Sequence, residues 1–300
     1  MPETVGQLSD LIAALVQNGK IAPDSYLLFV NDGCTDGTWR LLEEAFERNP
    51  HVCALRLTGN VGQQNALFAG LSAVCGRCDM AVSIDADLQD DIGVMEEMID
   101  LFHDGADVVY GVRRERKTDS FFKRATAHLF YKVMAWLDTG TVYNHAEYRL
   151  MSARVLEELM RYPERNLFVR GLVPLIGYRS EKVYYARKSR TAGKSKYPLG
   201  KMLATAFEGI TSLSSRPITM LVALGAAMLV CTFMALMGML LSFLRGGAVP
   251  GWLSIMASVW LLGGLQLVAI GVVGAYIGRT YLEVKRRPRY HIDCFLSHDP

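Results

Sequence analysis

The chain of 300 residues carries 32 Lys and Arg against 30 Asp and Glu, and its net charge of +2 gives no electrostatic reason to expect a nucleic-acid partner. Hydrophobic residues make up 51% of the sequence but are unevenly distributed. The first two thirds intersperse charged and apolar residues as a soluble α/β domain does, whereas the last third contains two long uncharged stretches. The sequence therefore predicts one large domain, over residues 1–198, followed by a membrane attachment.

The first predicted elements are a helix, a strand and a second helix. Apolar residues recur at helical spacing over 4–18, which predicts an amphipathic helix. The apolar segment 26–30 predicts a strand, which leads through the polar turn NDGCTDGT (31–38) into a helix over 38–48. Such a turn lies at the carboxyl edge of a parallel sheet, where open α/β folds bind their ligands.

Asp32 in this turn has two alternative roles. Its carboxylate could accept a hydrogen bond from a nucleotide base or ribose. The turn could instead supply only a helix cap, for which Asp36 or Thr35 would be equally suitable. The residues alone favour neither role.

The strand–turn–helix pattern then repeats. A predicted strand over 52–57 leads into GNVGQQN (59–65) and a helix over 66–75, whose small residues would allow close packing on a sheet. The apolar segment 80–84 predicts a buried strand that ends where the carboxylates of DADLQD (85–90) begin.

Asp85 and Asp87 are two residues apart, so on an extended backbone both side chains leave the same face. They would repel each other unless a cation lies between them. Mg²⁺ or Mn²⁺ suits such oxygen ligands and keeps positions open for diphosphate oxygens. Gln89 continues the spacing and could add a carbonyl oxygen. The alternative is a pair of solvated carboxylates at a strand end, which the D-x-D pattern alone does not exclude.

A helix over 93–102 and a strand over 107–112 complete the order βαβαβαβ, with a polar or glycine-containing turn after each strand. This order predicts a doubly wound, Rossmann-like α/β sheet. A nicotinamide-dependent dehydrogenase would share that sheet, but no G-x-G-x-x-G sequence follows any predicted strand.

Two basic segments follow the predicted sheet. One precedes an amphipathic helix over 121–137, and it is either a solvated surface or a site for a lipid phosphate. Its members are Arg113, Arg114, Arg116, Lys117, Lys123 and Arg124. The other, over 187–197, is polar and contains glycine, which predicts a loop that closes on an anionic substrate. An amphipathic segment over 199–215 then predicts an interfacial position at the membrane.

The uncharged stretches 217–244 and 246–278 each exceed the roughly 20 residues that a helix needs to cross a bilayer, and neither has a polar stripe. Joined by a short connection, they predict a two-helix transmembrane hairpin over 216–280, followed by a basic tail over 281–300. Glycines in the second stretch would permit close packing within the hairpin or in a homo-oligomer.

Positive charge flanks both outer ends of the predicted hairpin. The flanking residues are Lys201, Arg216, Arg279, Lys285, Arg286, Arg287 and Arg289. The positive-inside rule therefore predicts a multi-pass protein of the cell (inner) membrane, with the large domain and both termini in the cytoplasm.

Five motifs, followed by the two hydrophobic helices, resemble one known family in type and order. They are NDGCTDGT (31–38), GNVGQQNALFAG (59–70), DADLQD (85–90), AEYRLMS (146–152) and RTAGKSKY (190–197). Nearly the whole chain is similar to family 2 glycosyltransferases with the GT-A fold. The similarity is to the polyprenyl-phosphate branch, which includes dolichol-phosphate mannose synthase and bactoprenol glucosyltransferases. Because that family opens with a strand ahead of the helix over 4–18, the resemblance implies that the first strand of the domain is missing.

The resemblance also implies a role for individual positions. The nucleotide-sugar donor would be bound by Asp32, Asn60, Gly62 and Asp85. Mg²⁺ or Mn²⁺ on its diphosphate would be held by Asp85, Asp87 and Gln89. The acceptor phosphate would be bound by Arg113, Arg124, Arg149, Arg187, Lys194 and Lys196. Asp87 and Arg124 would be the catalytic residues.

The expected function is inverting transfer of one sugar, from UDP-glucose or another UDP-sugar, to undecaprenyl phosphate at the cytoplasmic membrane face. Two hydrophobic helices are too few for a processive synthase, which must carry a polymer across the membrane. A catalytically inactive membrane-bound scaffold, or truncated pseudoenzyme, is the alternative that the missing strand leaves open. The presence of Asp85, Asp87 and Gln89 argues against that alternative.

Overall fold

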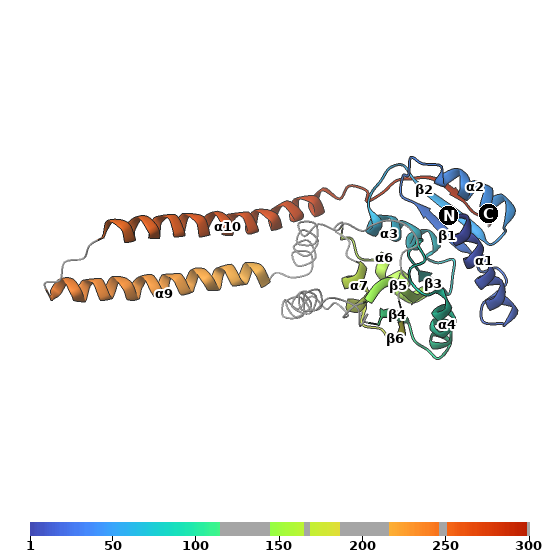
Figure 1. Cartoon of the computed structure of the whole chain (residues 1–300), viewed down its shortest axis with the longest axis horizontal. Helices are drawn as coiled ribbons and strands as arrows, with labels where there is room; N and C mark the ends of the chain where they lie inside the picture. The colour runs from blue at the N-terminus through green and yellow to red at the C-terminus, as the bar shows by residue number, and fades with distance from the viewer. Residues whose placement is uncertain (115–144, 165–168, 187–215, 246–250, 299–300) are drawn as a thin grey trace. The chain divides into compact units, whose positions relative to one another are not determined.

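The computed structural model describes residues 1–114, 145–164, 169–186, 216–245 and 251–298 (Figure 1). Of these, the residues up to 186 and those from 287 form one compact unit, and residues 216–286 form a second. The helix predicted over 121–137, the closing loop over 187–197 and the interfacial segment over 199–215 lie outside the described residues.

The first unit alternates strands and helices, as predicted. Its elements up to the fourth strand are α1 (Pro2–Gln17), β1 (Leu27–Asn31), α2 (Thr38–Arg48), β2 (Val52–Leu57), α3 (Gln63–Val74), β3 (Met80–Ser83), η1 (Ile92–Val94), α4 (Met95–His103) and β4 (Val108–Arg113). Those that follow are β5 (His145–Ser152), α6 (Ala153–Met160), α7 (Val169–Ile176), β6 (Ser180–Tyr185) and β7 (Ile292–Leu296). Every element predicted up to residue 113 is present, with small shifts at its ends.

The strands form two sheets, with the orders β1-β2-β7 and β3-β5-β4-β6. β1 runs parallel to β2, and β4 runs parallel to β6. β5 lies between β3 and β4 and is antiparallel to both, while β7 is antiparallel to β2. The α/β class is therefore confirmed, but the sheets are mixed and the prediction of a single doubly wound sheet is corrected. One reason is β5, which pairs antiparallel with both β3 and β4 and whose Tyr148, Leu150 and Met151 are buried.

β1 and β3 do not pair with each other in the part of the chain that the structure describes, although α3 packs against both. Leu28 of β1 and Ala81 of β3 contribute to one apolar cluster beneath α3, together with Phe68. Both strands are only half-buried over most of their length, whereas β2 is almost wholly buried. Among the described residues, β1 and β3 are therefore edge strands of their two sheets.

Apolar side chains alternate between the two faces of β4, because successive residues of a strand point to opposite sides. Val108 and Tyr110 pack in a cluster with α3, α6 and α7. Val109 packs in a second cluster with Leu15 of α1 and Met98 of α4. The four-stranded sheet thus lies between two helical layers, which hold the ends of β3 and β4 in place.

The C-terminal residues do not form the predicted tail. Residues 281–285 belong to a long helix, and Ile292–Leu296 is strand β7. Cys294 and Leu296 pack in one apolar cluster and Phe295 packs in another, as the alternation of a strand requires. Asp293 forms an ion pair with Arg56 of β2 at 2.5 Å. The apolar residues Cys294, Phe295 and Leu296 are compatible with a strand, but so short a segment beside a basic cluster is a weak signal.

The second unit contains helices α9 (Arg216–Leu244) and α10 (Trp252–Lys285), which lie side by side (Figure 1). By length and composition, one described stretch, Ser258–Lys285, is long and apolar enough to cross a membrane. α9 contributes a shorter apolar stretch, Ile218–Met234. The prediction of two transmembrane helices is therefore not confirmed, and association between protomers through these helices stays a prediction.

Candidate functional site

The turns that follow β1 and β2 are in direct contact. The carboxylate of Asp32 accepts hydrogen bonds from the backbone N–H groups of Val61, at 2.8 Å, and Gly62, at 3.0 Å. Gly33 has a φ of +63°, and a Cβ at this position would lie 2.3 Å from the carbonyl carbon of Gly59. Only glycine fits there, because it tolerates positive φ and has no Cβ. The contact brings the predicted donor residues Asp32 and Gly62 together.

The structure separates the two roles considered for the first turn. Asp36 accepts a hydrogen bond from the N–H of Thr38, at 3.0 Å, at the start of α2. Asp32 instead reaches across to the turn that contains Asn60. Asp36 therefore bonds a backbone N–H at the start of α2, whose N-cap residue is Gly37, and nucleotide binding by Asp32 and Asn60 stays a proposal.

The turn after β3 carries the three predicted metal ligands, Asp85, Asp87 and Gln89. The N–H of Leu88 donates to the carbonyl of Asp85 at 3.2 Å, and Leu88 has a φ of +47°, so the chain reverses tightly. Asp87 is exposed and accepts from the backbone N–H of Gln89 at 3.2 Å and from its Nε2 at 2.8 Å. Gln89 is itself buried. Its amide group therefore positions Asp87, which is a different role from the predicted metal ligand.

The electrostatic environment of Asp85 is unfavourable for its charge. Burial raises the pKa of this carboxyl group above its usual value. Nearby negative charges raise the pKa further and Arg113 opposes them; the carboxylates concerned are Asp90, Asp87 and Glu147. A divalent cation would relieve this repulsion. The described residues contain no group of three or more His, Cys, Asp or Glu arranged for a metal, and a hard cation held by Asp85 and Asp87 stays a prediction.

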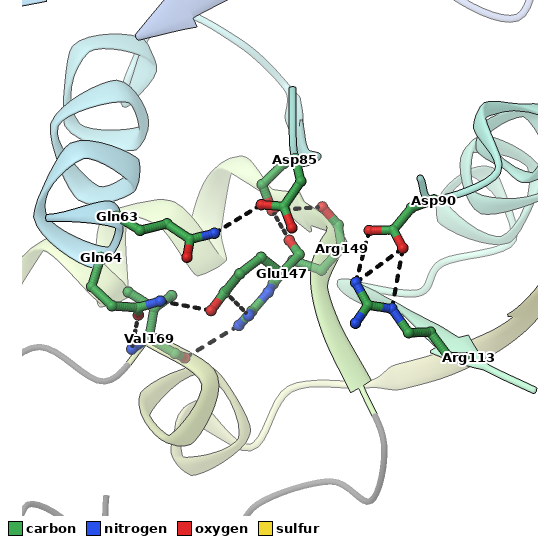
Figure 2. A network of polar contacts seen from close by, with 9 residues as sticks. Gln63, Gln64, Asp85, Asp90, Arg113, Glu147, Arg149 and Val169 are labelled. Atoms are coloured by element: carbon green, nitrogen blue, oxygen red, sulfur yellow. Dashed lines mark hydrogen bonds and ion pairs between the residues drawn. The ribbon is translucent and has the colours of Figure 1, made fainter. Parts of the chain in front are cut away.

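The first turn of helix α3 links the turn after β2 to the carboxylates of Asp85 and Glu147 (Figure 2). Gln63 Nε2 donates to Asp85 Oδ1 at 2.8 Å. Gln64 Nε2 donates to Glu147 Oε1 at 2.6 Å, and Gln64 Oε1 accepts from the N–H of Val169 at 3.1 Å. The sequence analysis gave neither glutamine a role. The available signal was a pair of polar residues at the start of a helix otherwise rich in small and apolar side chains.

Glu147 and Arg149 form a buried ion pair on β5. Arg149 Nη2 donates to Glu147 Oε2 at 2.5 Å, and Arg149 Nη1 donates to the carbonyl of Val169 at 3.2 Å. The Arg149 side chain is 0% exposed and the Glu147 side chain is 3% exposed. Ser83, at the end of β3, donates its hydroxyl to the carbonyl of Glu147 at 2.6 Å. A phosphate would have to compete with Glu147 for this guanidinium group, and acceptor binding by Arg149 stays a prediction.

Arg113 is also paired. Its Nε and Nη2 donate to the two carboxylate oxygens of Asp90, both at 3.1 Å, and its Nε also donates to the hydroxyl of Tyr185 at 3.3 Å. Asp90 is buried, whereas the Arg113 side chain is 24% exposed. An acceptor phosphate would compete with Asp90 for this guanidinium group, and acceptor binding by Arg113 stays a prediction. The other predicted acceptor residues lie outside the described residues: Arg124, Arg187, Lys194 and Lys196.

Comparison with known proteins finds similar glycosyltransferases. A family model described as glycosyl transferase family 2 matches residues 7–160. The chain is 50% identical to the uncharacterized glycosyltransferase YkoT of Bacillus subtilis (strain 168), over 99% of this chain and 88% of that protein. It is 39% identical to the prophage bactoprenol glucosyl transferase homolog of Escherichia coli (strain K12), over 89% and 87% of the two chains. It is 40% identical to the bactoprenol glucosyl transferase of Shigella phage SfII, over 89% and 86%.

Proposed function

The chain belongs to glycosyltransferase family 2, and we propose that it transfers one sugar from a nucleotide sugar to undecaprenyl phosphate at the cytoplasmic membrane face. The observation that carries the proposal is the contact between three turns. Asp32 holds the turn at Val61 and Gly62, and Gln63, the next residue, reaches Asp85. A nucleoside site and a cation site would then adjoin, as a nucleotide-sugar donor requires.

The donor would lie across these turns. Asp32, Asn60 and Gly62 would bind the nucleoside, and Asp85 with Asp87 would hold Mg²⁺ or Mn²⁺ at the diphosphate. The cation, when bound, would offset the negative charge that develops on the leaving diphosphate. UDP-glucose is our first choice of donor, because two of the similar proteins are named as bactoprenol glucosyl transferases. Other UDP-sugars are the next candidates.

The acceptor needs little activation. A phosphate monoester has a second pKa of about 6 and is therefore largely ionised near neutral pH. It can attack the anomeric carbon without a strong general base, and direct attack inverts the configuration. The protein would mainly position two anions and offset their charge. We retain Arg113, Arg124, Arg187, Lys194 and Lys196 as proposed acceptor ligands, with Arg124 as the catalytic cation.

Membrane attachment supports the choice of a lipid acceptor. The stretch Ser258–Lys285 is long and apolar enough to cross a membrane, and its Leu267 and Ile270 are largely exposed to the surroundings. Exposed apolar side chains in such numbers are costly in water. We therefore propose a membrane protein with its domain in the cytoplasm, in which α9 and α10 form the predicted hairpin. The inactive scaffold is the second candidate, and it is favoured by the edges of β1 and β3, which pair with no further strand among the described residues.

The donor can be identified with purified, detergent-solubilised protein, Mn²⁺ and undecaprenyl phosphate. Each of a panel of labelled nucleotide sugars is supplied separately, and the label is followed into the lipid phase. We expect transfer from one donor, with UDP-glucose first. If no nucleotide sugar labels the lipid and all of the nucleotide sugars remain intact, the inactive scaffold becomes the proposed function in place of the transferase.

A further inference from the structure

We propose that Gln63 is a further residue of the cation site, and that its side-chain amide serves Asp85 in two ways. Without a cation, the amide N–H donates to Asp85, as the structure shows. With a cation, the amide turns and presents its carbonyl oxygen to the metal. The inference rests on the proposed cation at Asp85 and Asp87.

The position of Gln63 makes this change feasible, because its backbone is fixed and its side chain is not buried. Asp32 holds the N–H groups of Val61 and Gly62 directly before it. Asn65 Nδ2 donates to the carbonyl of Val61 at 2.9 Å, which ties the first turn of α3 to the same loop. The Gln63 side chain is exposed and reaches from this anchored turn to Asp85 Oδ1 (Figure 2).

An N–H group and a divalent cation cannot occupy the same side of one carboxylate oxygen, since both are positive. A half-turn of the terminal amide of Gln63 exchanges its nitrogen for its oxygen and leaves the shape of the side chain almost unchanged. The last torsion angle of a glutamine is broad and roughly two-fold, so the turn costs little. Amide carbonyl oxygens are accepted ligands of hard cations. One side chain can therefore stabilise Asp85 both without the cation and with it.

The two other glutamines near the carboxylates are less suited to this role. Gln89 is buried, and its Nε2 is held by Asp87 Oδ2 at 2.8 Å. Gln64 is bonded at both ends of its amide, to Glu147 and to the N–H of Val169. Turning Gln64 would bring its oxygen against a buried carboxylate. Gln63 therefore has the side-chain amide that can turn most easily, and the metal-ligand role of Gln89 stays a separate prediction.

The test measures Mn²⁺ affinity of the full-length protein in detergent, from the loss of the electron paramagnetic resonance signal of free Mn²⁺. No donor or acceptor is added, so the readout is independent of turnover. Gln63→Ala should weaken Mn²⁺ binding about tenfold, as removal of groups around a metal commonly does. Gln63→Glu, which keeps the oxygens and loses the N–H, should bind at least as tightly as the unaltered protein. The Mn²⁺ affinity of Gln63→Glu should stay this high in about 1 M salt, where a Debye length of about 3 Å screens the attraction between Mn²⁺ and distant negative charges.

Gln7→Ala is the matched control, because Gln7 Nε2 also donates to a carboxylate, that of Glu3, at 3.2 Å on an exposed surface of α1. Its Mn²⁺ affinity should equal that of the unaltered protein. Unchanged affinity in Gln63→Ala, or affinity in Gln63→Glu as weak as in Gln63→Ala at high salt, overturns the role of Gln63. If Asp87→Ala leaves Mn²⁺ binding intact, the cation site itself is elsewhere, and the proposed metal site falls together with this inference.

Discussion

Replacing Asp87 with Ala should lower the turnover of sugar transfer by at least about 100-fold, since a catalytic cation contributes several kcal/mol and each 1.36 kcal/mol is a factor of ten. Asp87 is exposed at the tip of the turn after β3, and its two oxygens are oriented by Gln89. Its loss removes one of two carboxylates from the proposed cation site but no buried packing. Membrane attachment and folding should therefore be unchanged. Turnover is measured as labelled sugar in the lipid phase.

Two further variants separate charge from shape. Asp87→Asn keeps an acceptor for the Gln89 side chain but loses the negative charge, and it should be nearly as inactive as Asp87→Ala. Asp24→Ala removes an exposed carboxylate from the loop before β1, at the opposite end of that strand from Asp32, and should leave turnover unchanged. Near-normal turnover in Asp87→Ala would contradict the metal assignment.

Replacing Arg149 with Met should lower the free energy of unfolding by about 3–5 kcal/mol, because it leaves a buried carboxylate without its partner. Glu147 would keep the Gln64 hydrogen bond but lose the opposite charge, at a position that is 3% exposed. The measurement is a denaturant titration in detergent followed by circular dichroism. An acceptor-binding Arg149 would behave differently, with a raised KM for the lipid and unchanged stability.

The double variant Glu147→Gln, Arg149→Met provides the control. It removes both charges, and the glutamine can still bond to Gln64, so most of the stability lost in Arg149→Met should return. If the double variant loses as much free energy of unfolding as the two single variants lose together, the two side chains do not act as a pair. That result would also weaken the assignment of Arg149 to a structural role.

The sequence predicts the local elements of this fold well, because periodicity and turn residues act over short distances. The strand at 52–57 and the helix at 38–48 were predicted at their observed ends. Strand pairing was not predicted, since β5 pairs with β3 and β4 across long separations in the chain. Likewise, nothing in IDCFL indicates that β7 pairs with β2.

For the candidate site, too, the sequence predicts the local features and does not predict the contacts between distant residues. The two-residue spacing predicts Asp85 and Asp87 on one face of an extended backbone, but β3 ends at Ser83 and the chain reverses over these residues, so they lie in a turn. The spacing of residues in the sequence does not predict that Asp90 pairs with Arg113. Nor does it predict that Gln63 reaches Asp85, because that bond joins residues from two different turns. The sequence does not indicate that Arg149 is buried. Only the packing around its side chain shows this.

The measurement that tests the central claim most directly compares two acceptors of equal chain length, undecaprenyl phosphate and undecaprenol. Purified protein, Mn²⁺ and the active nucleotide sugar are used with each, and the lipid products are identified by mass spectrometry. The ionised phosphate is the proposed nucleophile, so sugar should appear on the phosphate lipid and not on the alcohol. Equal transfer to undecaprenol, or release of free sugar with neither lipid modified, would contradict the proposed function.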